Sequence, residues 1–387
     1  IRALNAEAYI CLFGLYASLN EDYLLQGLID AAIGGEFEEP LLKLLATLEQ
    51  GENLAISGVS TSHHSSQPWL QRAPLVLPQR AVLPALDHYA RLEWNGTAHI
   101  AGYTETTRGC KHTCQHCPIT PVYHGRFFAI PAELVLADIR AQVEQGAQHI
   151  TFGDPDFFNG PTHAMRITRA LHREFPDVTF DSTIKIEHLL KQRHLLPELR
   201  ANGCAFVVSA VESLNDEVLL RLDKGHTSAG VEEAFALMEE AGIALRPSLM
   251  PFSPWETLES YLRLLSFFEE HHLVEHVDPV HFSIRLLIPP GSALLNAPDA
   301  AQWLRELDPA AYSYRWQHPD PRTDDLHRAI SEVVEKAHRA QADPIETFFS
   351  IKVLAFAAAG RDMCLSCSIN DYGTRKVIPH LTETWFC

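Results

Sequence analysis

The stretch Cys110-Lys111-His112-Thr113-Cys114-Gln115-His116-Cys117 places three thiols in one short segment, with three and then two residues between consecutive cysteines. A closed structural zinc site takes four ligands, and no fourth cysteine lies nearby. The spacing therefore favours a four-iron cluster that is held by three thiolates and has one iron open for a substrate. The alternatives are a zinc site completed by His112 or His116, or three unrelated thiols.

The spacing of these cysteines resembles that of the radical S-adenosylmethionine (SAM) enzymes. The resemblance implies that Cys110, Cys114 and Cys117 hold a [4Fe-4S] cluster and that SAM chelates the open iron. It also implies that an electron from the reduced cluster breaks a carbon–sulfur bond of SAM. His116 stands where many members have an aromatic residue that packs on SAM, and an imidazole can stack in the same way.

Composition narrows the class of protein. The 387 residues are 46% hydrophobic and 21% charged, which is typical of a globular chain with a full core. A formal net charge of -18 argues against general binding to nucleic acid or anionic lipid. There is no apolar membrane span or signal peptide pattern, and the eight cysteines do not form a dense disulfide framework. We therefore expect a cytoplasmic protein with a small-molecule substrate and no nucleic-acid or membrane partner.

The first 56 residues indicate strand, helix, strand and helix, with apolar runs at 8–17 and 29–35 and helical spacing at 20–26 and 37–48. In the branch of the radical SAM superfamily that this chain resembles, the N-terminal domain is similar to cobalamin-binding domains. We interpret residues 1–56 as part of such a doubly wound domain. Because they contain no Asp-x-His-x-x-Gly ligand motif, no cobalamin is expected. Residues 57–95, rich in Ser, His and Pro, are expected to form a linker.

From residue 99 onward, apolar strands alternate with helical stretches. The expected strands are 99–106, 149–152, 179–186, 205–211, 244–250 and 280–288, and the expected helices are 131–145, 163–175, 187–201, 231–241 and 258–270. This alternation predicts an α/β fold with a parallel sheet. We expect a partial (β/α)6 barrel of the TIM type over 96–298, with active residues where the strands end.

The end of the second expected strand carries three candidate SAM ligands. Gly153, Asp154 and Asp156 stand where many radical SAM enzymes have Gly-Gly-Glu and bind the SAM amino group. Glycine would let the backbone approach SAM, and Asp154 or Asp156 would pair with its ammonium. For Asp156 the alternative is an Asp-Pro turn with a helix cap.

Later strand ends supply further candidates for SAM binding, namely Lys185, Glu187, Ser209, Glu212 and Arg285. Carboxylates and hydroxyls can bind ribose or ammonium, and a lysine can pair with a carboxylate. The alternative for Lys185 and Glu187 is a solvated ion pair. Arg285 lies in an apolar strand and must find an anion, either the SAM carboxylate or a core aspartate.

Residues 299–387 indicate a helical extension that contains Cys364-Leu365-Ser366-Cys367 and ends in Cys387. Thiols at this spacing suit a soft thiophilic ion or a reducing pair. The alternative is buried structural thiols or half of a zinc site.

Four segments carry a narrower resemblance: Gly-Asp-Pro-Asp-Phe-Phe-Asn at 153–159, Lys-Ile-Glu-His at 185–188, Asp-Lys-Gly-His-Thr at 223–227 and Pro-Phe-Ser-Pro-Trp at 251–255. They are similar to the radical SAM proteins named for a Cys-Cys-Ala-Glu-Pro or Cys-selenocysteine-Ala-Glu-Pro tail. The likeness runs along most of the chain. The given sequence stops at Trp385-Phe386-Cys387, about where that tail would begin.

This subfamily includes the enzyme of arsinothricin biosynthesis, which transfers the 3-amino-3-carboxypropyl group of SAM to trivalent arsenic. The resemblance implies the same transfer here, with arsenite as substrate and a reductant such as flavodoxin or ferredoxin as partner. We expect Cys364 and Cys367 to present the arsenite. One alternative is an enzyme whose 5′-deoxyadenosyl radical abstracts hydrogen from an organic or peptide substrate. Another is an iron–sulfur or zinc binding protein without catalysis.

Overall fold

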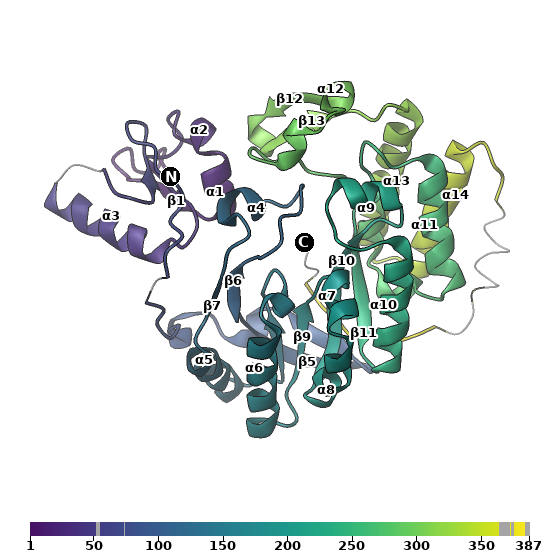
Figure 1. The fold of residues 1–387 in the computed structure, drawn as a ribbon, viewed down its shortest axis with the longest axis horizontal. Helices are drawn as coiled ribbons and strands as arrows, with labels where there is room; N and C mark the ends of the chain where they lie inside the picture. The colour runs from purple at the N-terminus through teal and green to yellow at the C-terminus, as the bar shows by residue number, and fades with distance from the viewer. Residues whose placement is uncertain (52–54, 73, 364–371, 373–374, 384–387) are drawn as a thin grey trace. The chain divides into compact units, whose positions relative to one another are not determined.

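The structure is a computed structural model that describes residues 1–387 except 52–54, 73, 364–371, 373–374 and 384–387 (Figure 1). The chain forms two compact units made of interleaved segments. The N-terminal unit comprises Ile1–Leu75, Gly109–Phe128 and Leu287–Trp316, and the sheet unit comprises Val76–Arg108, Ala129–Leu286 and Gln317–Cys387. The four consecutive segments expected from the sequence stay a prediction.

A seven-stranded sheet organises the sheet unit, in the order β11-β10-β9-β8-β5-β4-β14. Its strands are β4 (Arg91–Trp94), β5 (Thr97–Thr104), β8 (His149–Phe152), β9 (Thr179–Thr183), β10 (Cys204–Glu212), β11 (Ala244–Leu249) and β14 (His380–Leu381). Neighbours from β5 to β11 pair in parallel, whereas β4 and β14 add antiparallel strands at the other edge. This mixed α/β sheet is consistent with the partial TIM-type barrel expected from the sequence.

Helices follow the parallel strands, as a parallel sheet requires. They are α5 (Ala132–Glu144), α6 (Pro161–Glu174), α7 (Ile186–Lys191), α8 (Leu196–Ala201), α9 (Asp216–Arg221), α10 (Ser228–Glu240) and α11 (Leu258–Glu270), with α13 (Pro321–Ala340) and α14 (Pro344–Ala358) after them. The sequence encodes their starts. Thr257 and Ser260 form a capping box at α11, and Asn215 and Thr227 cap α9 and α10.

The sixth expected strand is wrong. Residues 280–288 begin within a 3-10 helix, Pro279–Ser283, and contribute only a single bridge between Arg285 and Phe252. The Asp278 side chain accepts from the Val280 amide, and Pro279 fixes the first turn, so this segment starts as a helix. The helix expected at 187–201 is also interrupted: a 3-10 helix, Arg193–Leu195, separates α7 from α8, which has Pro197 in its first turn.

The N-terminal unit contains a three-stranded sheet of β1 (Cys11–Phe13), β2 (Ala31–Ile33) and β3 (Val59–Ser60). Strands β1 and β2 are parallel, and β3 is antiparallel to β2. Its helices are α1 (Leu15–Leu19), α2 (Glu21–Leu24), α3 (Glu38–Gln50), α4 (Thr120–Tyr123) and α12 (Ala300–Trp303). The expected order of strand, helix, strand and helix is therefore present in residues 1–56.

Two of the expected segments contain strands that the sequence analysis did not predict. Residues 57–95 contain β3 and β4, in which Val59 and Leu92 are fully buried. The expected helical extension also contains strands: β12 (Leu304–Asp308) and β13 (Ser313–Trp316) form an antiparallel pair, and β14 joins the main sheet. A further short sheet pairs β6 (Thr107–Gly109) with β7 (Phe127–Ala129).

In the described part of the chain, no helix has the length and apolar character that a membrane span needs.

Candidate active site

The cysteine loop belongs to the N-terminal unit and begins at a position that requires glycine. Gly109 has φ +74, and a Cβ there would lie 2.5 Å from Tyr123 Cδ1 and 2.6 Å from the Arg126 carbonyl oxygen. Cys110 and Cys114 are buried and Cys117 is half-buried.

Distant segments of the same unit hold this loop in place. The Tyr123 hydroxyl donates to Glu36 Oε1 at 2.9 Å, and both residues are buried. Ser292 Oγ donates to the Gln115 carbonyl at 3.0 Å, and Thr120 Oγ1 donates to the Cys114 carbonyl at 3.0 Å. Sequence reasoning did not find Glu36, Tyr123 or Ser292, because nothing local to each residue signals a partner so far along the chain.

The donor set suits the cluster that the motif predicts. Three cysteine side chains on one loop offer the soft sulfur ligands that iron–sulfur clusters use. The two glycines that follow β2 pack closely against the chain itself: a Cβ on Gly34 would lie 2.5 Å from Ser18 Oγ, and one on Gly35 would lie 2.4 Å from the Trp69 carbonyl oxygen. These glycines serve packing within the chain. The expected absence of cobalamin and the stacking role of His116 stay predictions.

In the sheet unit, Gly153 follows β8 directly and has no room for a side chain. A Cβ there would lie 1.9 Å from Tyr103 Oη and 2.1 Å from Tyr103 Cζ. Tyr103, on β5, donates its hydroxyl to Glu105 Oε1 at 3.4 Å. Burial, and then the Glu105 charge, raise the pKa of Tyr103 above its ordinary value, so it stays a neutral donor. Glycine is therefore needed here for close packing, whether or not SAM also approaches its backbone.

Asp154 is buried, and both of its carboxylate oxygens have donors. Oδ1 accepts from the Thr106 and Thr107 hydroxyls at 2.7 and 2.6 Å, and Oδ2 accepts from the Thr106 amide at 2.8 Å. Burial raises the pKa of Asp154 to about 6, although these hydrogen bonds lower it in part. Asp154 thereby ties the end of β8 to the residues that lead into the cysteine loop. Its role toward the SAM ammonium stays a prediction.

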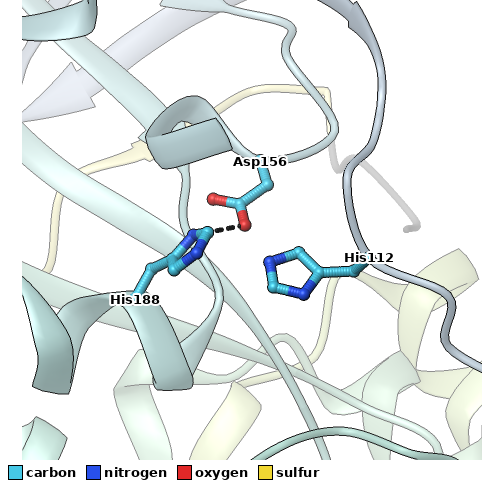
Figure 2. A group of neighbouring side chains, drawn as sticks. All are labelled: His112, Asp156 and His188. Carbon is cyan, nitrogen blue, oxygen red and sulfur yellow. Dashed lines mark ion pairs between the residues drawn. The ribbon is translucent and has the colours of Figure 1, made fainter. Parts of the chain in front are cut away.

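Asp156 lies opposite His188 in the same unit, and both side chains are almost fully buried. The distance between His188 Nδ1 and Asp156 Oδ2 is 2.7 Å, and Figure 2 shows the two side chains facing each other. Asp156 Oδ1 also accepts from the Phe158 amide at 3.2 Å and caps the 3-10 helix Phe157–Asn159. The helix cap that the Asp-Pro sequence allowed is therefore present, together with a partner that the sequence did not reveal.

Charged residues gather at the ends of β9 and β10. Lys185 Nζ lies 3.4 Å from Glu187 Oε2, and Lys185 is buried rather than solvated. Glu212 ends β10 and pairs with Lys224, whose Nζ lies 2.9 Å from Glu212 Oε1. Ser209 is fully buried within β10. The structure thus brings the predicted residues of two neighbouring strand ends into one region and adds Lys224, which the sequence analysis did not single out.

Arg285 has a protein partner. Its Nη1 lies 2.6 Å from Asp324 Oδ1, and Asp324 Oδ2 accepts from the His318 amide at 3.0 Å. The sequence left open whether Arg285 pairs with the SAM carboxylate or with an aspartate. The structure pairs Arg285 with Asp324, and its role toward the SAM carboxylate stays a prediction. Cys364, Cys367 and Cys387 lie outside the described residues.

Known proteins were found that are similar to this chain in sequence. Residues 104–267 match the family model of the radical SAM superfamily. The chain is 25% identical over 234 residues to the hopanoid C-3 methylase of Methylococcus capsulatus. The aligned region covers 60% of this chain and 44% of that protein. It is 26% identical over 189 residues to the ribosomal protein uS12 methylthiotransferase RimO of Geobacter sulfurreducens. This aligned region covers 46% of this chain and 41% of that protein. The chain therefore spans less than half the length of these curated relatives.

Two solved structures share the fold. The cobalamin-dependent SAM radical enzyme OxsB with aqua-cobalamin bound has a TM-score of 0.73 at 14% identity, over 96% of this chain and 63% of that one. The radical SAM methyltransferase TsrM from Kitasatospora setae, with tryptophan and a SAM analogue bound, has a TM-score of 0.56 at 19% identity, over 69% of this chain and 54% of that one. Residues 104–267 therefore resemble the radical SAM superfamily, and the fold of the chain is similar to that of these two solved structures.

Proposed function

We propose that this radical SAM enzyme transfers the 3-amino-3-carboxypropyl group of SAM to trivalent arsenic and so forms the carbon–arsenic bond of arsinothricin. The observation that supports this most is how the segments of the narrower resemblance meet at the strand ends. Asp156, from 153–159, pairs with His188, from 185–188. The turn at 223–227 reaches both Glu187 and Glu212.

The chain's own residues have two tasks in this proposal. Cys110, Cys114 and Cys117 would hold the [4Fe-4S] cluster, which when bound supplies the electron that breaks a carbon–sulfur bond of SAM. Residues at the strand ends would fix the orientation of SAM, because the bond in line with the open iron decides which group is released. The candidates for this positioning are Gly153, Asp154, Asp156, Lys185, Glu187, Ser209, Glu212 and Arg285.

In the proposed transfer, one carbon–sulfur bond breaks, methylthioadenosine leaves and one carbon–arsenic bond forms. Arsenic contributes its lone pair to the new bond and ends pentavalent, so the electron supplied at the start is returned. A reductant such as flavodoxin or ferredoxin would provide the first electron. Thiols bind trivalent arsenic as a soft acceptor, and we propose Cys364 and Cys367 for this role.

The test is anaerobic. Protein reconstituted with iron and sulfide is incubated with SAM and dithionite, with and without arsenite, and the nucleoside is identified by mass spectrometry. Methylthioadenosine, together with an arsenic-containing amino acid, is the expected result. A C114A variant is the control for cluster-dependent cleavage, and C364S with C367S tests the proposed thiols. Production of 5′-deoxyadenosine that does not depend on arsenite would contradict the proposal and favour hydrogen abstraction.

A second candidate is methyl or methylthio transfer to an organic substrate. The names of the two curated relatives, a methylase and a methylthiotransferase, favour it. The OxsB structure contains cobalamin, which would assist such a methyl transfer. Adding cobalamin to the same assay separates the candidates: cobalamin-dependent turnover of SAM, without an arsenical product, would support the second.

A further inference from the structure

The end of β10 has an unusual backbone. Glu212 has φ +66, a left-handed conformation that non-glycine residues rarely adopt. The Ser213 amide donates to the Val211 carbonyl at 2.9 Å across it, which forms a tight turn centred on Glu212. The pairing with β11 shifts register between Ala210 and Glu212. Strained residues of this kind persist where the surrounding structure holds them, and they concentrate at functional sites.

Lys224 holds the side chain of this strained residue. Its ammonium lies 2.9 Å from Glu212 Oε1, and the two side chains are only 3% and 10% exposed. A buried ion pair contributes little to stability when it is compared with apolar packing, because both charges lose their hydration. The pair nevertheless fixes the position of the carboxylate. Separating the two groups would leave a buried charge without its partner, which is costly.

The turn that carries Lys224 is shaped for this contact. Lys224 lies between two residues with positive φ, Asp223 at +53 and Gly225 at +73, and its amide donates to the Leu219 carbonyl at 3.1 Å. A Cβ on Gly225 would lie 2.5 Å from Glu187 Oε2. The same turn therefore contacts the Glu187 carboxylate, on α7 just after β9, and the Glu212 carboxylate at the end of β10.

We propose that Lys224 is a positioning residue that holds the Glu212 carboxylate in the orientation that binds SAM. This inference rests on the proposed role of Glu212 as a SAM ligand, and it does not depend on what accepts the transferred group. Lys224 acts through Glu212, so its contribution to SAM affinity disappears when Glu212 cannot bind. The Asp-Lys-Gly-His segment thus determines SAM affinity from outside the strand ends.

The experiment measures the Kd of SAM by equilibrium dialysis on anaerobically reconstituted protein, with iron content determined for each sample. K224M is expected to raise the Kd about tenfold. K224R retains the charge and is expected to restore most of the affinity. The matched control is K352M on α14, because Lys352 is also buried and also pairs with a carboxylate, that of Glu269. K352M is expected to leave the Kd within about twofold of wild type.

E212Q and the double variant E212Q with K224M complete the test. E212Q alone is expected to weaken SAM binding as much as K224M, and the double variant is expected to lose no more than E212Q does. Equal Kd values for wild type and K224M, or an additional loss in the double variant, would overturn the inference. If K224M does not fold or does not hold iron, the Kd values of E212Q and K224R test the inference. A wild-type Kd of SAM in E212Q would contradict it, because Glu212 would then not bind SAM. SAM binding without an arsenical product would count against the proposed function alone.

Discussion

The Tyr103 ring and the Gly153 backbone pack so closely that a single methyl group should disturb them. Gly153→Ala places a Cβ 1.9 Å from Tyr103 Oη and is expected to cost about 1–3 kcal/mol of unfolding free energy. Chemical denaturation measures the loss. Gly230→Ala on α10 is the control, because the nearest atom to its Cβ would be Leu190 Cδ1, the end of a side chain, at 3.2 Å.

A second variant tests the cause of that loss. Tyr103→Ala removes the clashing ring, so Gly153→Ala and Tyr103→Ala together should cost less than the sum of their separate effects. Strict additivity of the two costs would show that the Gly153 effect does not arise from Tyr103.

His226 should make the folded protein sensitive to acid. Burial, and then the Lys224 charge, lower the pKa of His226 from 6.5 to about 4. Above pH 6.5 the imidazole is neutral in both folded and unfolded chains, and its contribution to stability is fully present. Between about 6.5 and about 4 only the unfolded chain gains the proton, so stability falls by on the order of 3 kcal/mol.

We therefore expect His226→Gln to lose less stability than wild type on acidification from about pH 7.5 to about pH 5. Thermal unfolding at both pH values measures the difference. Burial also lowers the pKa values of His163, His276, His281 and His327, so the variant should keep part of the pH dependence. Identical pH dependence in wild type and variant would contradict the assignment to His226.

At the scale of elements, the cysteine loop depends on residues far from it in sequence. Tyr123→Phe removes the hydroxyl that donates to the buried Glu36 carboxylate and is expected to cost about 1–3 kcal/mol. Because α4 begins three residues after Cys117, the variant should also retain less iron after reconstitution. Tyr89→Phe is the control, since Tyr89 is 44% exposed. Unchanged melting temperature and iron content in Tyr123→Phe would show that this contact does not support the loop.

The parallel strands could be predicted from the sequence because each is a short apolar run followed by a helical pattern. The expected strand at 280–288 was wrong since its apolar residues outweighed Asp278 and Pro279, which start a 3-10 helix. Residue types at strand ends indicated which side chains carry charge, but not their partners. His188 for Asp156, Lys224 for Glu212 and Asp324 for Arg285 are set by tertiary packing.

At the scale of the whole molecule, two units carry different parts of the chemistry. The N-terminal unit provides the three thiols and the segments that fix their loop. The sheet unit provides charged side chains at neighbouring strand ends. The match to the radical SAM superfamily covers residues 104–267, whereas the bond cleaved and the acceptor of the transferred group belong to the proposal.

The most direct test follows the atoms of the transferred group. SAM labelled with carbon-13 in its aminocarboxypropyl chain is incubated with the reduced, reconstituted enzyme and arsenite, and the products are separated with parallel detection of arsenic and mass. The account predicts that the label appears in an amino acid that contains arsenic, in equal amount to methylthioadenosine. Label found only in methionine, with 5′-deoxyadenosine as the nucleoside, would contradict it.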